Sequence, residues 1–327
     1  MDNVGNKNNK VKYENLADRS DKDQIWDHHR KETDLVSVLY EQEKEFYRYF
    51  ERMEDCSGRL EFSQLVNKDT GEMKIKLKSA HFCRVRHCPV CQWRKSLMWK
   101  ARYWKALPEI QSKFPAGRWL FFTLTVRNCE ITEVKNTIQN MHKAFIKLIQ
   151  RKHFKTYNLG FIKTTEITRS KTGAAHPHFH VLLFMKSEYF NRGYLSNKAW
   201  GELWQDCLGV DYTPSVKIKS VRNKKTGEVV KMGEDGMEHA VAETLKYSVK
   251  PADMYADREW FHEMTRQVHK MRFVSTGGVL KDIFSEDVSE EEMLLLNDEE
   301  ETDEDLNNNI FFNWHKKNSK YRRKIVE

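Results

Sequence analysis

The chain has 327 residues, which is long enough for one large domain or two smaller ones with buried cores. Its formal net charge is +8, but residues 286–305 contain twelve Asp and Glu and no Lys or Arg, so the remainder carries 8 + 12 = +20. A body that is so basic and 12% aromatic indicates a polyanionic partner, most simply nucleic acid. No run of 18 apolar residues is present, which excludes a membrane-spanning helix and a membrane partner.

The N-terminal region is polar, rich in Asn and Lys and without periodicity, so we expect residues 1–33 to be disordered. It lacks the apolar core of a signal peptide, and we therefore expect a cytoplasmic protein. In that compartment the six cysteines are expected to be thiols or metal ligands rather than disulfides. Residues 34–53 alternate apolar and charged side chains at three- and four-residue spacing, which predicts an amphipathic helix.

Four cysteines follow this helix and form the first candidate metal site. Cys56 stands upstream of Cys83, Cys88 and Cys91, whose C-x4-C-x2-C spacing supplies, with Cys56, the four thiolates of a tetrahedral structural zinc site. His81 and His87 are alternative ligands if Cys56 is not used, and a set of buried free thiols is the alternative to any metal. We expect residues 34–110 to form a helical, cysteine-rich zinc-binding module.

Residues 111–285 alternate strand and helix patterns and are expected to form the main domain. Residues 92–107 before it read as a helix whose aromatic side chains favour a core role over base stacking. Residues 118–126 are dense in aromatic and β-branched side chains, which is typical of a buried strand. Residues 131–153 carry the apolar stripe of a helix that packs on a sheet.

The second candidate metal site lies on a predicted hairpin. Residues 160–168 and 176–184 read as two strands joined by a short turn that contains Gly173. Alternate side chains of a strand share a face, so His178 and His180 point the same way, and a turn centred near 172–173 places Glu166 opposite or beside them. Two imidazoles and a carboxylate favour a catalytic Mg²⁺ or Mn²⁺. Whether His176 contributes stays open.

A predicted helix over residues 237–250 carries the candidate nucleophile. His239, Glu243 and Tyr247 fall at i, i+4 and i+8, with Lys250 three residues further on. A phenol close to a carboxylate and an ammonium is suited to nucleophilic attack, whereas a solvated charged stripe is the alternative interpretation. The role of His239 stays open.

Residues 286–327 are acidic and then basic, and we expect them to form a solvated tail. Whether the basic end contacts DNA or the acidic run is left open by the pattern.

Three stretches resemble the motifs of a known family. Residues 121–125 (Phe-Phe-Thr-Leu-Thr), 176–180 (His-Pro-His-Phe-His) and 247–250 (Tyr-Ser-Val-Lys) are similar, in this order, to those of single-tyrosine HUH endonucleases. The particular likeness is to the replication initiator (Rep) proteins of rolling-circle plasmids from Gram-positive bacteria. The cysteine cluster also resembles that family, and the similarity covers about residues 50–285.

The resemblance implies an α+β fold of the RRM/ferredoxin-like type, with a central antiparallel sheet, the histidines on a middle strand and helices packed on one side, preceded by the zinc module. It implies that His178, His180 and Glu166 hold the catalytic metal. Tyr247 would nick one strand of the double-strand origin, single-stranded at the nick site, form a 5′-phosphotyrosine and free a 3′-OH primer. Glu243 would activate water at termination, and Lys250 would steady the phosphate.

The resemblance also implies a host helicase and polymerase as partners. A transposase or mobilisation relaxase of the same superfamily is an alternative function. A non-enzymatic, zinc-dependent DNA-binding regulator is an alternative from a different class.

Overall fold

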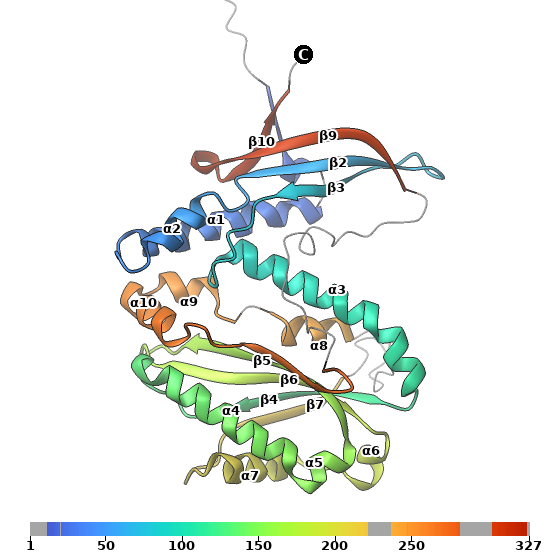
Figure 1. The fold of residues 1–327 in the computed structure, drawn as a ribbon, viewed down its shortest axis with the longest axis vertical. Coiled ribbons are helices and arrows are strands. Elements are labelled where there is room, and N and C mark those ends of the chain that lie inside the picture. Colours follow the sequence, from blue (N-terminus) through green and yellow to red (C-terminus); the bar gives the residue numbers. More distant parts are fainter. Residues whose placement is uncertain (1–11, 20, 222–236, 247, 282–302, 326–327) are drawn as a thin grey trace, which may run out of the picture. The chain divides into compact units, whose positions relative to one another are not determined.

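The computed structural model describes residues 12–19, 21–221, 237–246, 248–281 and 303–325, and it divides the chain into two compact units (Figure 1). The first unit combines residues 1–94 with 289–327, and the second contains residues 95–288. The first division falls within helix α3 (Pro89–Lys113), earlier than the expected boundary at residue 110. In the part of the chain that is described, no helix is long and apolar enough to cross a membrane.

The first unit is built on a five-stranded antiparallel sheet in the order β1-β10-β9-β2-β3. Its strands are β1 (Tyr13–Asn15), β2 (Arg59–Asn67), β3 (Met73–Ala80), β9 (Asp303–His315) and β10 (Lys320–Lys324). Helices α1 (Asp21–Glu41) and α2 (Tyr47–Glu54) cover one face, and the short helices are η1 (Leu16–Asp18) and η3 (Lys316–Asn318). The indole of Trp314 donates to Asp34 of α1, which ties this helix to the sheet.

The expectation of a disordered start is corrected for residues 13–18 and 21–33, which form β1, η1 and the first half of α1. The sequence pattern did not predict this helix because its buried face is largely polar and includes Asp27, Arg30 and Thr33. These groups have defined partners: Arg30 forms an ion pair with Asp34 at 2.8 Å, and Asp27 accepts from the Tyr321 amide at 2.8 Å. Buried polar groups with such partners stabilise a helix without leaving an apolar stripe.

The expectation of a solvated C-terminal tail is also corrected, for residues 303–325. They form β9, η3 and β10 within the sheet of the first unit. Ile310, Phe312 and Tyr321 are buried in its core. The strand β9 was not predicted because it begins with three acids and its apolar side chains follow only after Asp305. Residues 286–302 lie outside the described residues.

The second unit contains a five-stranded antiparallel sheet in the order β7-β4-β6-β5-β8. Its strands are β4 (Arg118–Thr125), β5 (Asn158–Arg169), β6 (Ala175–Met185), β7 (Val216–Ser220) and β8 (Val274–Gly278). The expected α+β class with a central antiparallel sheet is confirmed, and β6, the histidine strand, lies in the middle of it.

Helices cover both faces of this sheet, whereas the resemblance implied one. Alternate side chains of β6 explain this, since Phe179 and Val181 join one core and Leu182 and Phe184 join another. Helices α4 (Val134–Gln150) and α7 (Asn197–Leu208) complete the first core, and α3 and α8 (Met237–Thr244) complete the second. The shorter helices of this unit are η2 (Ile131–Glu133), α5 (Lys152–Tyr157), α6 (Glu188–Arg192), α9 (Pro251–Tyr255) and α10 (Arg258–Gln267).

The predicted helix over residues 237–250 is shorter than expected, because α8 ends at Thr244. Its end is held on the sheet by the Thr164 hydroxyl, which donates to the Thr244 carbonyl at 2.6 Å. Lys250 lies beyond this helix in an extended conformation (φ −72°, ψ 137°), where it precedes Pro251 and caps α9. Glu243 and Lys250 therefore do not share one helical face.

Candidate metal and catalytic site

The β5–β6 hairpin brings the candidate metal ligands together by register. Glu166 lies directly opposite His178, and Thr164 lies opposite His180. Directly opposed residues of an antiparallel pair share a face, so the carboxylate and both imidazoles project from the same side of the sheet. The predicted register is confirmed, with a turn through Gly173 whose φ of +89° suits glycine.

Three ligand atoms converge at this point. Glu166 Oε2 is 2.9 Å from His178 Nε2 and 2.7 Å from His180 Nε2, and the two nitrogens are 3.2 Å apart. Adjacent ligands of an octahedral ion at about 2.1 Å lie about 3.0 Å from one another. The three spacings therefore fit one divalent ion, and all three side chains are buried.

Neighbouring groups orient the imidazoles. His178 Nδ1 lies 3.2 Å from the carbonyl oxygen of His176, and His180 Nδ1 lies 3.5 Å from the hydroxyl of Thr123. A proton on Nδ1 of His178 that is donated to this carbonyl leaves the Nε2 lone pair free for a metal. The ring of Phe121 stacks on that of His180 at 5.5 Å and fixes its plane. His176 contributes its backbone here and is not part of the ligand group.

The carboxylate of the group is held in its charged form. Without an ion, burial raises the pKa of Glu166, but hydrogen bonds donated by Nε2 of His178 and of His180 lower it by more, and the net pKa lies well below the usual range. An ionised carboxylate and neutral imidazoles are the forms that coordinate a metal.

Lys246 is a site residue that the sequence analysis missed. Its Nζ lies 3.0 Å from Glu166 Oε2 and 2.6 Å from Glu243 Oε1, so one ammonium joins the two carboxylates. Burial lowers the pKa of Lys246, but the hydrogen bonds to Glu243 and Glu166 raise it to a net value above its ordinary one. The sequence feature that could have identified Lys246 is its position three residues after Glu243, because residues with this spacing are neighbours on a helix.

The other predicted catalytic residues have different outcomes. Glu243, in the last turn of α8, is brought to the site through Lys246. Lys250 is exposed and, within the described residues, makes no ion pair with the two carboxylates. Tyr247 and the side chain of His239 lie outside the described residues. On either side of Tyr247, Lys246 contacts Glu166 and the Ser248 carbonyl accepts from the Ile167 amide at 2.9 Å.

The cysteine cluster forms a separate group in the first unit. Sγ of Cys56 is 3.6 Å from that of Cys88 and 3.6 Å from that of Cys91, and Cys83 is 3.6 Å from Cys91. Ligands of a tetrahedral zinc ion with Zn–S bonds of about 2.3 Å lie about 3.8 Å apart. The four buried thiols therefore fit one such ion, and neither His81 nor His87 belongs to the group.

Backbone amides point at the same sulfurs. The amide of Arg84 donates to Cys91 Sγ at 3.3 Å, and that of Val85 donates to Cys83 Sγ at 3.5 Å. Arg84 adopts a φ of +55°, which turns the chain so that these amides face the cluster. Amide donors stabilise thiolate over thiol, which favours metal binding.

Comparisons with known proteins place this arrangement in a family. A model of a replication protein family matches residues 74–322, which is more than half of the chain. The chain belongs to this replication protein family. The match confirms the resemblance to Rep proteins and extends it beyond residue 285, to include β9 and most of β10.

Individual replication proteins from Gram-positive bacteria are similar over most of their length. A Protein rep from Bacillus amyloliquefaciens is 35% identical over 249 residues, which cover 72% of each chain. A Protein rep from Streptococcus pneumoniae is 33% identical over 71% of this chain and 70% of its own. A Replication protein from Staphylococcus aureus is 32% identical over 65% of this chain and 94% of its own. No solved structure matches the chain.

Proposed function

We propose that the protein initiates rolling-circle replication of a plasmid by nicking one strand of its double-strand origin. The observation that carries the proposal is the convergence of Glu166, His178 and His180 on the middle strand of the sheet, with Lys246 and Glu243 beside them. A structural metal site would not need a second carboxylate held at its edge by a lysine. Membership of a replication protein family supports DNA as the substrate.

Glu166 Oε2 and the Nε2 atoms of His178 and His180 would hold one Mg²⁺ or Mn²⁺. When bound, the ion would polarise the scissile phosphate and offset charge that develops on it. Thr123 and the His176 carbonyl keep the imidazoles in the orientation that this requires. Because three protein ligands leave coordination positions open, phosphate oxygens and water can reach the site.

The nucleophile in this proposal is Tyr247. Its phenolate oxygen attacks the scissile phosphorus, the bond from phosphorus to the 3′ oxygen breaks, and that oxygen leaves as a 3′-OH after taking a proton. The phosphodiester energy is conserved in a 5′-phosphotyrosine, which permits later rejoining. The contacts of Lys246 with Glu166 and of Ser248 with Ile167 support this role, because they hold the flanking chain against β5.

Glu243 would activate a water molecule for the terminating cleavage, so that a second tyrosine is not required. Lys246 would position this carboxylate through their 2.6 Å contact. Lys250, exposed at the start of α9, would bind a phosphate of the DNA once the strand is in place. The 3′-OH would then be extended by a host polymerase behind a host helicase.

The four cysteines would hold a structural Zn²⁺ in the first unit. They join the end of α2, through Cys56, to the segment that leads into α3. The buried tetrathiolate leaves no position for a substrate, which separates its role from that of the histidine site.

The proposal is tested with supercoiled plasmid that carries the cognate origin, incubated with the protein and Mn²⁺. The wild type should produce nicked circles and a covalent protein–DNA adduct, and Tyr247→Phe should produce neither. Glu243→Ala should nick but fail to terminate, which yields multimeric products. A non-enzymatic regulator would bind the origin and leave it supercoiled, and nicking by Tyr247→Phe would overturn the assignment of the nucleophile.

A further inference from the structure

The sheet of the first unit has two different faces. Helices α1 and α2 pack on one of them (Figure 1). On that face Trp314 donates to Asp34, and the Tyr321 amide donates to Asp27. The strand registers place another set of side chains on the opposite face, since successive residues of a strand alternate. We call this the open face; its residues are Tyr13, Asn15, Arg59, Glu61, Phe311, Asn313, His315, Arg322 and Lys324.

Aromatic rings and cations are interleaved across the open face. The guanidinium of Arg322 lies 4.9 Å from the ring centre of Tyr13, which in turn meets the ring of His315 edge-on at 5.8 Å. Further along, the guanidinium of Arg59 lies 4.2 Å above the ring of Phe311. Tyr13 is 41% exposed, so part of its ring is accessible to a stacking base.

The charge of the open face is positive. Arg59, Arg322 and Lys324 belong to it, and Lys78, at a bulge in β3, reaches it by donating to Asn309 at 3.2 Å. Lys320 is excluded because its ammonium pairs with Asp27 on the helix side. Glu61, a carboxylate on this described part of the sheet, already accepts from Asn309 at 2.8 Å.

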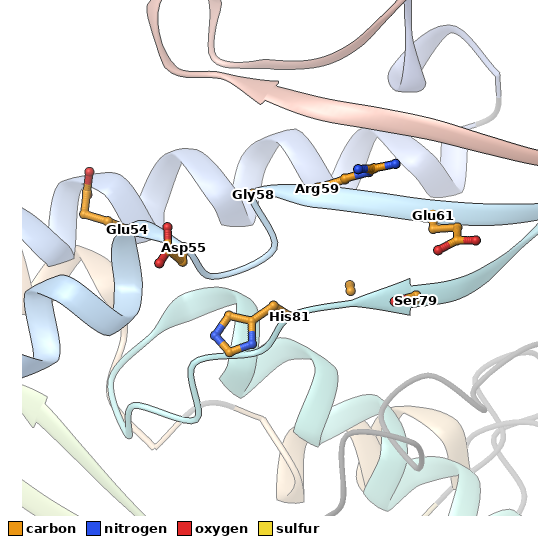
Figure 2. A pocket seen from close by; sticks show the side chains of 8 residues that line it. Glu54, Asp55, Gly58, Arg59, Glu61, Ser79 and His81 are labelled. Carbon is orange, nitrogen blue, oxygen red and sulfur yellow. The ribbon is translucent and has the colours of Figure 1, made fainter.

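A pocket of about 520 Å³ lies at one end of the open face, where β2 and β3 meet the cysteine loops (Figure 2). Its lining combines Arg59, Glu61 and Ser79 from the strands with Glu54 at the end of α2 and with Asp55 and His81 from the adjoining loops. Carboxylates repel phosphates but accept hydrogen bonds from the amino groups of bases. The pocket is therefore suited to a base edge, and the cationic strand β10 is suited to the backbone.

We propose that the open face is a binding surface for single-stranded DNA, separate from the histidine site. Unpaired bases stack on aromatic rings and guanidinium planes while cations contact the phosphates. A duplex groove admits a helix or a two-stranded ribbon, whereas the face of a five-stranded sheet is too broad for it. The choice of DNA as the partner rests on the proposed function. The definition of the open face depends only on the strand registers and on the contacts between its side chains.

The test measures binding of the full-length protein to a fluorescent 30-nucleotide oligo-dT and to a 30-base-pair duplex by anisotropy. Arg322→Ser combined with Lys324→Ser should weaken oligo-dT binding about tenfold. It should also flatten the slope of log affinity against log salt by about 1.4, because each phosphate contact on a single strand contributes about 0.7. Lys44→Ser combined with Arg48→Ser removes the same charges from exposed positions, one in the α1–α2 connection and one in the first turn of α2, and should change neither quantity.

The aromatic part of the proposal is tested separately. Tyr13→Ser should weaken oligo-dT binding about tenfold through lost stacking, and Tyr13→Phe should restore it. The proposal would be overturned if the Arg322→Ser/Lys324→Ser variant bound oligo-dT as tightly as the wild type. It would also be overturned if the control pair lost as much affinity, or if only duplex binding became weaker. Nicking of origin plasmid at saturating protein should be unchanged in these variants. If the wild type does not nick the plasmid, the proposed function is wrong. The oligo-dT measurements still show whether the open face binds single-stranded DNA.

Discussion

At the scale of single residues, the convergence of the candidate metal ligands could be predicted because it depends on local geometry. A two-residue period and a short turn fix which side chains of a hairpin meet, so Glu166, His178 and His180 follow from spacing alone. Lys246 could not be predicted in the same way. Lys246 faces Glu166 only because α8 ends two residues before it and the chain turns toward β5. The sequence pattern instead predicted that the helix continues to residue 250.

Replacement of Lys246 separates metal binding from catalysis. In Lys246→Met the ammonium no longer competes with the ion for Glu166, so we expect Mn²⁺ to bind about tenfold more tightly. Glu243 loses the contact that positions it, so termination should slow even with the metal site saturated. Lys246→Arg should stay close to the wild type in both respects. Calorimetry of Mn²⁺ binding checks this, and equal affinity in Lys246→Met and the wild type would contradict it.

Lys163 is a buried lysine on the opposite side of β5 from Glu166. Its side chain is 3% exposed, lies over the ring of Phe179 and places Nζ 2.9 Å from Nδ1 of His142. Burial lowers the pKa of Lys163 to about 7, and burial together with the charge of Lys163 lowers the pKa of His142 to about 4.

The depressed pKa of Lys163 predicts a pH-dependent stability. Between about pH 7 and the ordinary lysine pKa of about 10.4, the unfolded chain binds a proton that the folded chain does not, so stability rises with pH. Lys163→Met removes this dependence. We expect Lys163→Met to have a larger free energy of unfolding than the wild type at pH 6.5. This difference should decrease by about 2 kcal/mol between pH 6.5 and pH 9, because the wild type gains stability as the pH rises. Urea unfolding at both pH values measures it, and a constant difference would contradict the buried, neutral lysine.

At the scale of elements, strands with an apolar period were predictable and a helix with a polar buried face was not. The predicted strands correspond to β4, β5 and β6 within a few residues, because each shows apolar alternation or an apolar run. The first half of α1 was missed because Asp27, Arg30 and Thr33 face its core. The cysteine cluster was predictable as a group, since three of its four members, Cys83, Cys88 and Cys91, lie close together around the start of α3.

Removal of one cysteine ligand should release the metal and loosen the elements that it joins. We expect Cys88→Ser to lower bound zinc to near zero and to destabilise the first unit by more than about 3 kcal/mol, because binding of structural zinc contributes on the order of 10 kcal/mol to folding. Cys129→Ser, which changes a cysteine outside the cluster, is the matched control and should keep wild-type zinc. Atomic absorption and thermal unfolding report both quantities, and undiminished zinc in Cys88→Ser would rule out the tetrathiolate.

At the scale of the whole molecule, the first unit is assembled from both ends of the chain. Strand β9 pairs with β2 more than 200 residues earlier, as in the pair Leu60 and Phe312. Pairing between strands so far apart in the sequence cannot be recognised from local composition. The sequence analysis therefore predicted a charged tail for the C-terminal region. Its basic strand β10, whose role the pattern left open, instead becomes part of the open face.

The central claim is that Tyr247 attacks DNA at the site formed by Glu166, His178 and His180. The most direct measurement is mass spectrometry of peptides from protein incubated with supercoiled origin plasmid and Mn²⁺, after nuclease and protease digestion. We expect one modified peptide, in which Tyr247 carries a 5′-phosphorylated nucleotide, and no adduct when His178 and His180 are both changed to Ala. An adduct on another residue, or nicked plasmid without any adduct, would contradict the account.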